Sequence, residues 1–261
     1  MPLRCVYTDL DGTLLGRDGS LFHDADGNFT LLAARGLEAC ARVGAEVVIK
    51  SGRRRETVAA NARLLGQRSY IYEVGAGMVI DGEETLLTGD LKPRDGKSIH
   101  DLIDESGAPR LLLEHFAGRL EYHDPWHVNR DVSHLMRGTI DAREANALLE
   151  QNDLGHLRLV DNGAIAPRPQ FEGRPHAYHL IPAQASKAAA VAAHMQARGY
   201  APEDCIAVGD SAEDADVARV VGRFFLVANA EDGISGANIV RTEGRNGEGF
   251  YEAVIQTLAA T

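Results

Sequence analysis

Short apolar segments that end in polar clusters recur along this chain, and amphipathic segments of helical periodicity separate them. A strand–helix–strand alternation of this kind is typical of a parallel sheet covered by helices. The sequence therefore predicts an α/β fold with a Rossmann-like, doubly wound parallel sheet. The expected strands are residues 3–8, 45–50, 69–74, 205–210 and 223–229, and the expected helices are residues 30–43, 186–199 and 249–260.

Two of the expected helices carry residues that favour their ends. Thr30 and Ser186 are expected as N-caps, because a hydroxyl oxygen there can accept a hydrogen bond from a free backbone N–H of the first turn. Gly44 and Gly199 follow the last periodic residues and are expected to terminate the helices.

The middle of the chain has a different composition. From about Asp81 to Pro182 it is rich in His, Arg, Glu and aromatic residues and carries interrupting prolines. This pattern predicts mixed strands and helices over 111–115, 119–123, 141–150 and 157–160. We therefore expect a core formed by residues 1–81 and 183–261, with an α+β domain of residues 82–182 inserted into it.

Composition excludes several classes of function. The formal net charge of −11 argues against nucleic acid and anionic membrane as partners. Because the chain shows neither a signal-peptide pattern nor an apolar run of membrane-spanning length, the cytoplasm is the expected compartment. Cys5, Cys40 and Cys205 lie in apolar segments without CxxC spacing and are expected to be reduced packing residues. The short basic run at residues 50–55 is interpreted as a local anion site.

The polar clusters follow the expected strands directly, and ligands of parallel α/β sheets bind at the carboxyl ends of the strands. Four carboxylates would repel one another if they converged there without a cation. Because Mg²⁺ prefers carboxylate and water oxygens and accepts few protein ligands, the sequence predicts a magnesium site. The carboxylates are those of Asp9, Asp11, Asp210 and Asp214.

Other residues of these clusters are suited to a phosphate group. Ser51 can donate a hydrogen bond to a phosphate oxygen, and Lys187, at the start of a helix, can neutralise both a phosphate and a carboxylate. Gly12 lets the backbone approach an anion closely.

Four motifs, in this order and rough spacing, resemble those of the haloacid dehalogenase superfamily of phosphohydrolases: DLDGTLL, KSGR, Lys187 opening a helix, and GDSAED. The insert lies between the second and third motifs, as in the class IIB, or Cof-type, branch. EVGAGMVI and GDSAEDADVA look most similar to the mannosyl-3-phosphoglycerate and sucrose-phosphate phosphatases of that branch. The insert resembles the branch's cap domain in position and size more than in sequence.

The resemblance implies a role for each matching residue. Asp9 would be the nucleophile that becomes an aspartyl-phosphate, and Asp11 the general acid and then the base. Asp9, Asp210 and the Asp11 carbonyl would hold Mg²⁺, and Asp214 would lie on or next to the ion. Lys187 would also be catalytic and would bind the phosphoryl group. The other expected phosphate-binding residues are Gly12, Thr13, Ser51 and Gly52; the expected substrate contacts are Arg53, Glu73, Gly75, Ala76, His123 and Arg168.

The chain departs from the family pattern at two places. Glu213 stands where the family usually has Asn, and it adds a negative charge beside the predicted site. Val74-Gly75 stands where sugar phosphatases of this branch usually have Asn-Gly. The second departure weakens the assignment of substrate contacts at this turn.

Structural interpretations compete with the functional ones. Asp9 and Asp11 could belong to a solvated turn, Ser51 could be a helix N-cap, Lys187 alone could be a surface lysine, and Asp214 could be an ordinary acid in a first helical turn. The segment DADGN at 24–28 hints at a calcium loop, but its glycine and twelfth position do not match, so a polar turn is expected.

The histidines and arginines of the insert are also ambiguous. His123, His127 and His134 offer zinc ligands, but Pro125 disrupts the helix that would align the first two. Lining of a substrate cleft and solvated surface are the alternatives, and they apply equally to His115, Arg130, Arg137, Arg168 and His176.

The sequence thus predicts a Mg²⁺-dependent phosphatase for a small phosphorylated metabolite, either a sugar phosphate or a phosphoglycerate conjugate such as mannosyl-3-phosphoglycerate. The expected assembly is a monomer or homodimer. Two other hypotheses remain at this point: a phosphomutase that uses the same site, and a catalytically silent regulatory protein.

Overall fold

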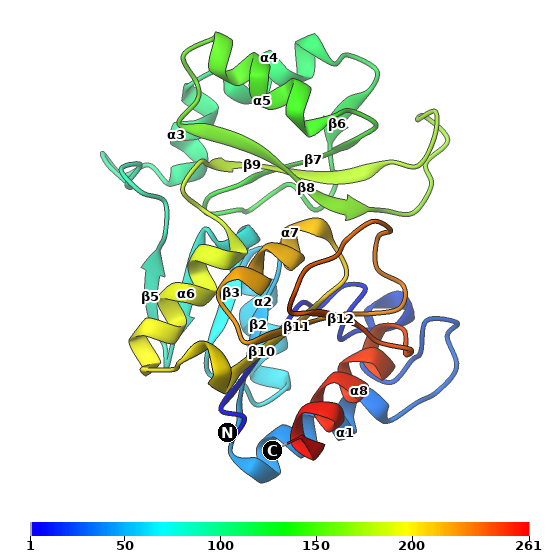
Figure 1. Ribbon diagram of the computed structural model, residues 1–261. Coiled ribbons are helices and arrows are strands. Elements are labelled where there is room, and N and C mark those ends of the chain that lie inside the picture. Colours follow the sequence, from blue (N-terminus) through cyan, green and yellow to red (C-terminus); the bar gives the residue numbers. More distant parts are fainter. Residues whose placement is uncertain (1, 261) are drawn as a thin grey trace.

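Two β-sheets divide the chain, which a computed structural model describes from residue 2 to residue 260 (Figure 1). The larger sheet has eight strands in the order β12-β11-β10-β1-β2-β3-β4-β5, and the smaller has four in the order β6-β7-β9-β8. The smaller sheet and its helices lie above the larger sheet in Figure 1. This arrangement confirms the predicted α/β fold with an inserted α+β cap.

Six strands of the larger sheet are parallel, and two antiparallel strands close one edge. Parallel pairing of β1 with both β2 and β10 brings the carboxyl ends of these three strands to one edge of the sheet. The strands are β1 (Cys5–Thr8), β2 (Glu46–Lys50), β3 (Tyr70–Tyr72), β4 (Gly77–Ile80), β5 (Glu83–Leu86), β10 (Cys205–Gly209), β11 (Arg223–Leu226) and β12 (Ile239–Arg241).

Helices cover both faces of this sheet. Helix α1 (Leu32–Val43) packs against α8 (Asn246–Ala259), and α6 (Lys187–Arg198) lies on the opposite side (Figure 1). Right-handed crossovers require this, because the chain moves along the sheet in one direction from β1 to β2 and in the other when it passes through α6 to β10. Gly36 permits the first contact, because a Cβ atom there would lie 2.7 Å from the Phe250 ring. The remaining helices of this part are α2 (Arg55–Leu64) and the short α7 (Ala212–Ala215).

Capping residues explain where two of these helices begin and end. The Ser186 hydroxyl accepts a hydrogen bond from the Ala189 N–H, and Gly44 and Gly199 adopt left-handed conformations just past the ends of α1 and α6, which confirms three predictions. The prediction for Thr30 was wrong by one residue. Leu31 occupies the N-cap position of α1, and the Thr30 hydroxyl accepts a hydrogen bond from the Leu32 N–H.

The smaller sheet and three helices form the cap. Its antiparallel strands are β6 (Leu120–Tyr122), β7 (His134–Gly138), β8 (Leu157–Ala164) and β9 (His176–Pro182). Helices α3 (Ile99–Glu105), α4 (Ala108–His115) and α5 (Ala142–Gln151) cover one face of the sheet, and their apolar side chains form a core separate from that of the larger sheet. The other face is turned toward the larger sheet (Figure 1).

The insertion begins later than the sequence pattern suggests. Strand β5 pairs with β4 in the larger sheet, whereas a boundary between residues 81 and 82 would assign β5 to the cap. At the other end, β9 of the cap sheet finishes at Pro182. The chain therefore leaves the larger sheet after Leu86 and returns to it through α6.

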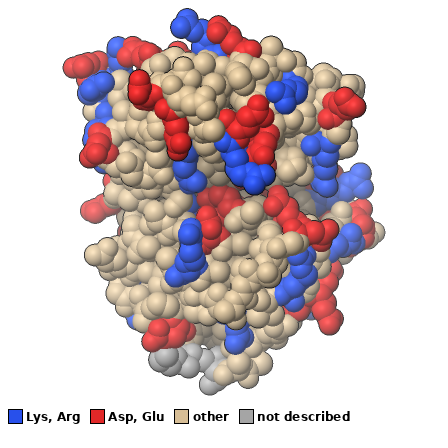
Figure 2. All heavy atoms as spheres, turned by 45° about the horizontal axis from the view of Figure 1, so that its top comes forward, with Lys and Arg blue, Asp and Glu red and all other residues tan. Residues whose placement is uncertain are grey.

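Two further sequence expectations concern the surface. No helix between residues 2 and 260 has both the length and the apolar character that crossing a membrane requires. Acidic and basic side chains are interspersed over the face shown in Figure 2.

Asp24 accepts hydrogen bonds from the N–H groups of Asp26 and Asn28, so the segment at 24–28 forms the expected polar turn.

Candidate active site

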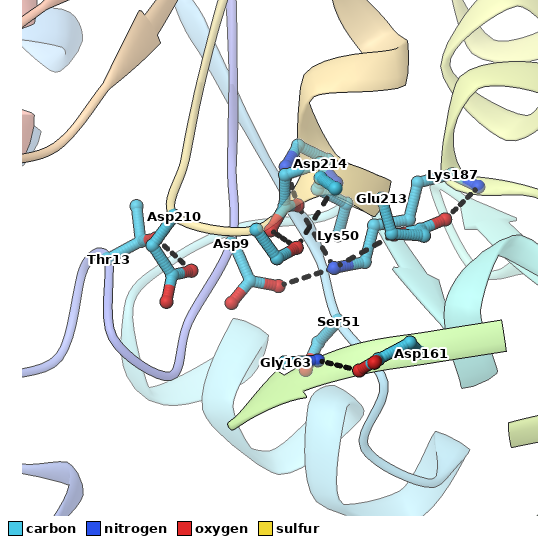
Figure 3. Close-up of polar contacts among 12 residues, drawn as sticks. Asp9, Thr13, Lys50, Ser51, Asp161, Gly163, Lys187, Asp210, Glu213 and Asp214 are labelled. Atoms are coloured by element: carbon cyan, nitrogen blue, oxygen red, sulfur yellow. Dashed lines mark hydrogen bonds and ion pairs between the residues drawn. The ribbon is translucent and has the colours of Figure 1, made fainter. Parts of the chain in front are cut away.

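Two strand ends bring together carboxylates that are far apart in sequence. Asp9 follows β1, and its N–H donates to the Val208 carbonyl on the neighbouring strand. Asp210 follows β10, and its Oδ1 accepts a hydrogen bond of 3.0 Å from the Thr13 hydroxyl. Oxygen atoms of Asp9, Asp210 and Asp214 all lie within 4.8 Å of one another (Figure 3). The parallel register thus converts separate sequence clusters into one acidic site.

Two buried lysines, one from β2 and one from α6, enter this cluster. Lys187 Nζ lies 3.1 Å from Asp9 Oδ1, 3.0 Å from Asp214 Oδ1 and 3.2 Å from Glu213 Oε2. Lys50, the last residue of β2, also donates to Asp214, and its side chain is fully buried. Asp214 receives a third hydrogen bond, of 2.7 Å, from the Ser211 hydroxyl. Its two oxygens are therefore largely occupied by the side chains that position the site.

Burial and neighbouring charge separate the pKa values of these acids. Burial raises the pKa of Asp9 well above its ordinary value, with Lys187 only partly offsetting it. Burial and the charge of Asp214 raise the pKa of Asp210 to about 7. Burial also acts on Asp214, but Lys187 and Lys50 outweigh it and lower the pKa of this carboxyl. Asp9 and Asp210 are therefore the two acids whose ionised forms the neighbouring lysines compensate only in part.

The donor set suits a hard divalent cation. It consists of carboxylate oxygens, and burial without a cation disfavours their ionised forms, as the raised pKa values of Asp9 and Asp210 show. Asp9 and Asp210 are the residues best placed to hold Mg²⁺, while Asp214 supports both lysines. Among residues 2–260, no group of neighbouring metal-ligating atoms includes His123, His127 or His134.

The Asp11 side chain is not part of the group formed by Asp9, Asp210 and Asp214, and it pairs with Arg53. The guanidinium donates two hydrogen bonds, from Nε to Asp11 Oδ2 at 2.7 Å and from Nη2 to Oδ1 at 2.5 Å. A third donation, to Asn61 on α2, fixes the arginine itself. Asp11 is half exposed and lines the cavity, so a substrate can reach it.

The glycines of the predicted phosphate site have structural reasons to be glycine. Gly12 has a φ of +78°, and a Cβ atom on it would lie 2.3 Å from Asp210 Oδ2. Ser51 accepts a hydrogen bond from the Arg53 N–H and lies before α2, whose N-cap is Arg54. The alternative interpretation of Ser51 as that helix's N-cap was therefore wrong.

A cavity of about 590 Å³ separates the larger sheet from the cap. The core contributes the acids, Lys187, Ser51 and Gly52 to its lining. The cap contributes side chains from β8, β9, the loop that joins these two strands and the loop before β7. These side chains include His123, Trp126, Arg130, Asn162, Arg174 and His179.

Only some of the residues that were expected to contact substrate line the cavity. Arg53 and His123 line the cavity, and burial lowers the pKa of His123 to about 4. Glu73, Gly75, Ala76 and Arg168 are absent from the described lining.

The turn at Glu73 instead joins the two parts of the chain. The Glu73 carboxylate accepts hydrogen bonds from the backbone N–H groups of Asp131, Val132 and Ser133 in the cap. A Cβ atom on Gly75 would lie 2.1 Å from the Ser186 carbonyl oxygen, and Ala76 belongs to the apolar core of the cap. Their places are therefore explained by packing and by attachment of the cap.

Sequence reasoning assigned no role to some residues in or next to the site. Lys50 had a recognisable signal, because it ends an otherwise apolar, buried strand. Asn162 had none, because its position depends on how the cap meets the core. Glu213, the unusual acid beside Asp214, accepts a hydrogen bond of 3.1 Å from the Lys187 N–H and so supports the lysine at the start of α6.

Comparison with known proteins gives the same result at the level of sequence and fold. A family model described as haloacid dehalogenase-like hydrolase matches residues 6–254. Phosphoglycolate phosphatase from Archaeoglobus fulgidus is 28% identical over 254 residues, which cover 96% of this chain and 95% of that protein.

Solved structures share the fold at lower sequence identity. Protein 0175 of Thermoplasma acidophilum has a TM-score of 0.67 at 18% identity, with 99% of each chain covered. The sucrose-phosphatase of Synechocystis, solved with sucrose and phosphate, has a TM-score of 0.65 at 15% identity, with 98% of each chain covered.

Proposed function

The chain belongs to the family of haloacid dehalogenase-like hydrolases and is a phosphatase, and we propose that it hydrolyses the phosphate ester of a small carboxylic acid, with phosphoglycolate as the leading candidate. The observation that carries this proposal is the contact of Lys187 with both Asp9 and Asp214 beneath the cavity between the larger sheet and the cap. The relatives that match over most of their length are named phosphoglycolate phosphatases. These names favour a small acid over the sugar phosphates that the sequence motifs suggested.

The proposed reaction begins with Asp9. One oxygen of its carboxylate forms a bond to phosphorus, the ester P–O bond breaks, and Asp11 gives a proton to the departing alkoxide. Water then attacks the aspartyl-phosphate while Asp11 takes back a proton, which releases phosphate and restores Asp9. Two carboxylates one residue apart are required because one acts as nucleophile and the other transfers protons.

The surrounding side chains stabilise the charge of the transferring group. Lys187 Nζ lies beside Asp9, and the Ser51 hydroxyl lies at the end of the neighbouring strand, so both can bind phosphoryl oxygens. Mg²⁺ held by Asp9, Asp210 and the Asp11 carbonyl would supply further neutralisation of phosphate charge. Arg53 orients Asp11 through its two hydrogen bonds.

The test is the release of inorganic phosphate from a defined panel, with Mg²⁺ and with EDTA. We expect Mg²⁺-dependent turnover that is fastest for phosphoglycolate, then for phosphoglycerates, and slower for glucose phosphate, sucrose phosphate and mannosyl-3-phosphoglycerate. The Asp9→Asn variant, which loses the nucleophile, should release no phosphate above about 10⁻⁴ of the wild-type rate.

Four results would contradict the proposal. A preference for a sugar phosphate would overturn the substrate, and an isomerised sugar phosphate without free phosphate would indicate the mutase. Equal rates in wild type and Asp9→Asn would overturn the mechanism. Unchanged turnover in EDTA would remove the role of the divalent cation.

A further inference from the structure

We propose that His179 and Asn162 of the cap form a binding site for the carboxylate of the substrate's leaving group. This inference rests on the proposed function, because it assumes a phosphorylated acid as substrate. In this proposal, two uncharged hydrogen-bond donors of the cap distinguish the phosphate ester of a carboxylic acid from that of a neutral alcohol.

The His179 and Asn162 side chains lie where the cap meets the loop of Ser51 and Gly52, which is called the phosphate-binding loop below. A Cβ atom on Gly52 would lie 2.9 Å from Asn162 Nδ2 and 2.9 Å from His179 Nε2. Gly163, the next residue of the cap, lies on the other side of the site, where its Cβ would be 3.5 Å from Glu231 Oε1. This segment of β8 therefore reaches between the two core loops that flank Asp9.

An irregularity of β8 produces this close approach. The pairing of β8 with β9 shifts register between Asp161 and Ala164, so the intervening residues leave the ladder. Asp161 anchors the segment, because its carboxylate accepts hydrogen bonds from the Gly163 N–H and from His176 Nδ1. The segment is thus held in place by contacts within the cap.

A chain of hydrogen bonds determines which nitrogen of His179 carries the proton. Arg130 Nη1 donates to the Ser133 hydroxyl at 3.0 Å, and the distance from that hydroxyl to His179 Nδ1 is 3.2 Å. Because the serine accepts from arginine, its proton is free to go to Nδ1, and Nε2 of the neutral ring then carries the N–H. Nε2 therefore presents a donor to the cavity.

The ring stays neutral at ordinary pH. Burial, and next the charge of Arg130, lower the pKa of His179 well below its usual value. The same arginine places a buried positive charge behind the ring, which favours an anion in front of it. Arg130 Nη1 also donates to the Gly52 carbonyl, so this cation is fixed to the phosphate-binding loop.

The Asn162 side chain is unpaired within the part of the chain that the structure describes. Neither polar atom of its side chain has a hydrogen bond to any residue from 2 to 260, and Oδ1 is fully buried. The unpaired Oδ1 is an acceptor that a water molecule can satisfy, whereas Nδ2 is a donor that is free to bind an acceptor oxygen of a ligand. With Nδ2 beside His179 Nε2, the two residues offer neighbouring N–H donors to a carboxylate.

Other cations of the cavity are less suited to this role. Arg54 already donates to the Thr57 hydroxyl and the Val128 carbonyl. Arg174 is exposed, and it is the alternative receptor for a carboxylate.

The experiment compares phosphoglycolate with ethyl phosphate, which has the same length but no carboxylate. His179→Asn keeps a group at the Nδ1 position and loses the donor at Nε2, whereas His179→Gln keeps a donor near Nε2. We expect His179→Asn to raise KM for phosphoglycolate about tenfold or more, with little change for ethyl phosphate, and His179→Gln to restore most of the preference. Asn162→Asp should have a larger effect, because it places a negative charge against the carboxylate.

The outcomes separate this inference from the proposed function. If wild type turns over both substrates equally, the proposed substrate class is overturned. If wild type prefers phosphoglycolate and both His179→Asn and Asn162→Asp leave that preference unchanged, the assignment alone is overturned. Loss of the preference in Arg174→Gln only would also overturn it. Unchanged melting temperatures exclude misfolding, and Asn162→Asp, on a half-buried segment, serves if His179→Asn does not fold.

Discussion

Replacing Glu73 by Gln should loosen the attachment of the cap. The Glu73 carboxylate is fully buried and accepts three backbone N–H bonds from the cap: 2.9 Å from Asp131, 3.2 Å from Val132 and 2.5 Å from Ser133. A hydrogen bond to a charged group contributes about 1.5–3 kcal/mol, and a neutral one about 1 kcal/mol. Gln keeps the shape, but it loses the charge, and its NH₂ group opposes one of the donors. The expected loss is therefore about 3 kcal/mol.

The chain contains one tryptophan, Trp126, which lies in the cap and lines the cavity. Urea unfolding followed by its fluorescence therefore reports on the cap, while far-UV circular dichroism reports on the whole chain. We expect Glu73→Gln to lower the free energy of unfolding measured by fluorescence by about 3 kcal/mol. Glu83→Gln, the same change at an exposed position of β5, is the control. A change below about 0.5 kcal/mol, or an effect on KM alone, would refute the role of Glu73 as an anchor of the cap.

Two further predictions concern buried charge. Lys50→Met leaves Asp214 with Lys187 and Ser211 as its remaining partners. We therefore expect the free energy of unfolding in urea to fall by about 3 kcal/mol, with the same change at exposed Lys92 as the control. Equal unfolding midpoints for Lys50→Met and wild type would contradict this prediction. Burial, and next His100, lower the pKa of His134 to about 4, so this neutral histidine stabilises the fold above pH 6.5 and loses about 3 kcal/mol as pH falls to 4. His134→Gln should make unfolding less dependent on pH in that range, and an unchanged slope would contradict this.

The fold and the acidic site could be predicted because they depend on short-range patterns. Apolar strands that end in Asp9, Ser51 and Asp210 must bring these side chains together once the strands pair in parallel, and β1 does pair in parallel with both β2 and β10. The helix ends at Gly44 and Gly199 are likewise set by local backbone conformation. Sequence reasoning works where a residue's role follows from its own strand or helix.

The roles of other residues depend on contacts between distant segments. Glu73 has the sequence context of a substrate contact, but its hydrogen-bond partners are in the loop before β7. No sequence pattern near residue 73 predicts that contact. The position of Asn162 depends on a register shift in β8 and on the docking of the cap against Gly52. Residues of this kind become recognisable only when the two sheets are placed against each other.

The cap is joined to the larger sheet through one outgoing and one returning segment, and these two run side by side: a Cβ atom on Gly89 would lie 2.7 Å from the Gln184 side chain. Adjacent crossing points make the insert a module that can be exchanged without cutting the sheet that carries Asp9. Chimeras spliced at residues 87 and 183 should therefore inherit the choice of alcohol from the donor of the insert and the hydrolytic step from the recipient. Such a separation would allow one catalytic scaffold to acquire many substrates.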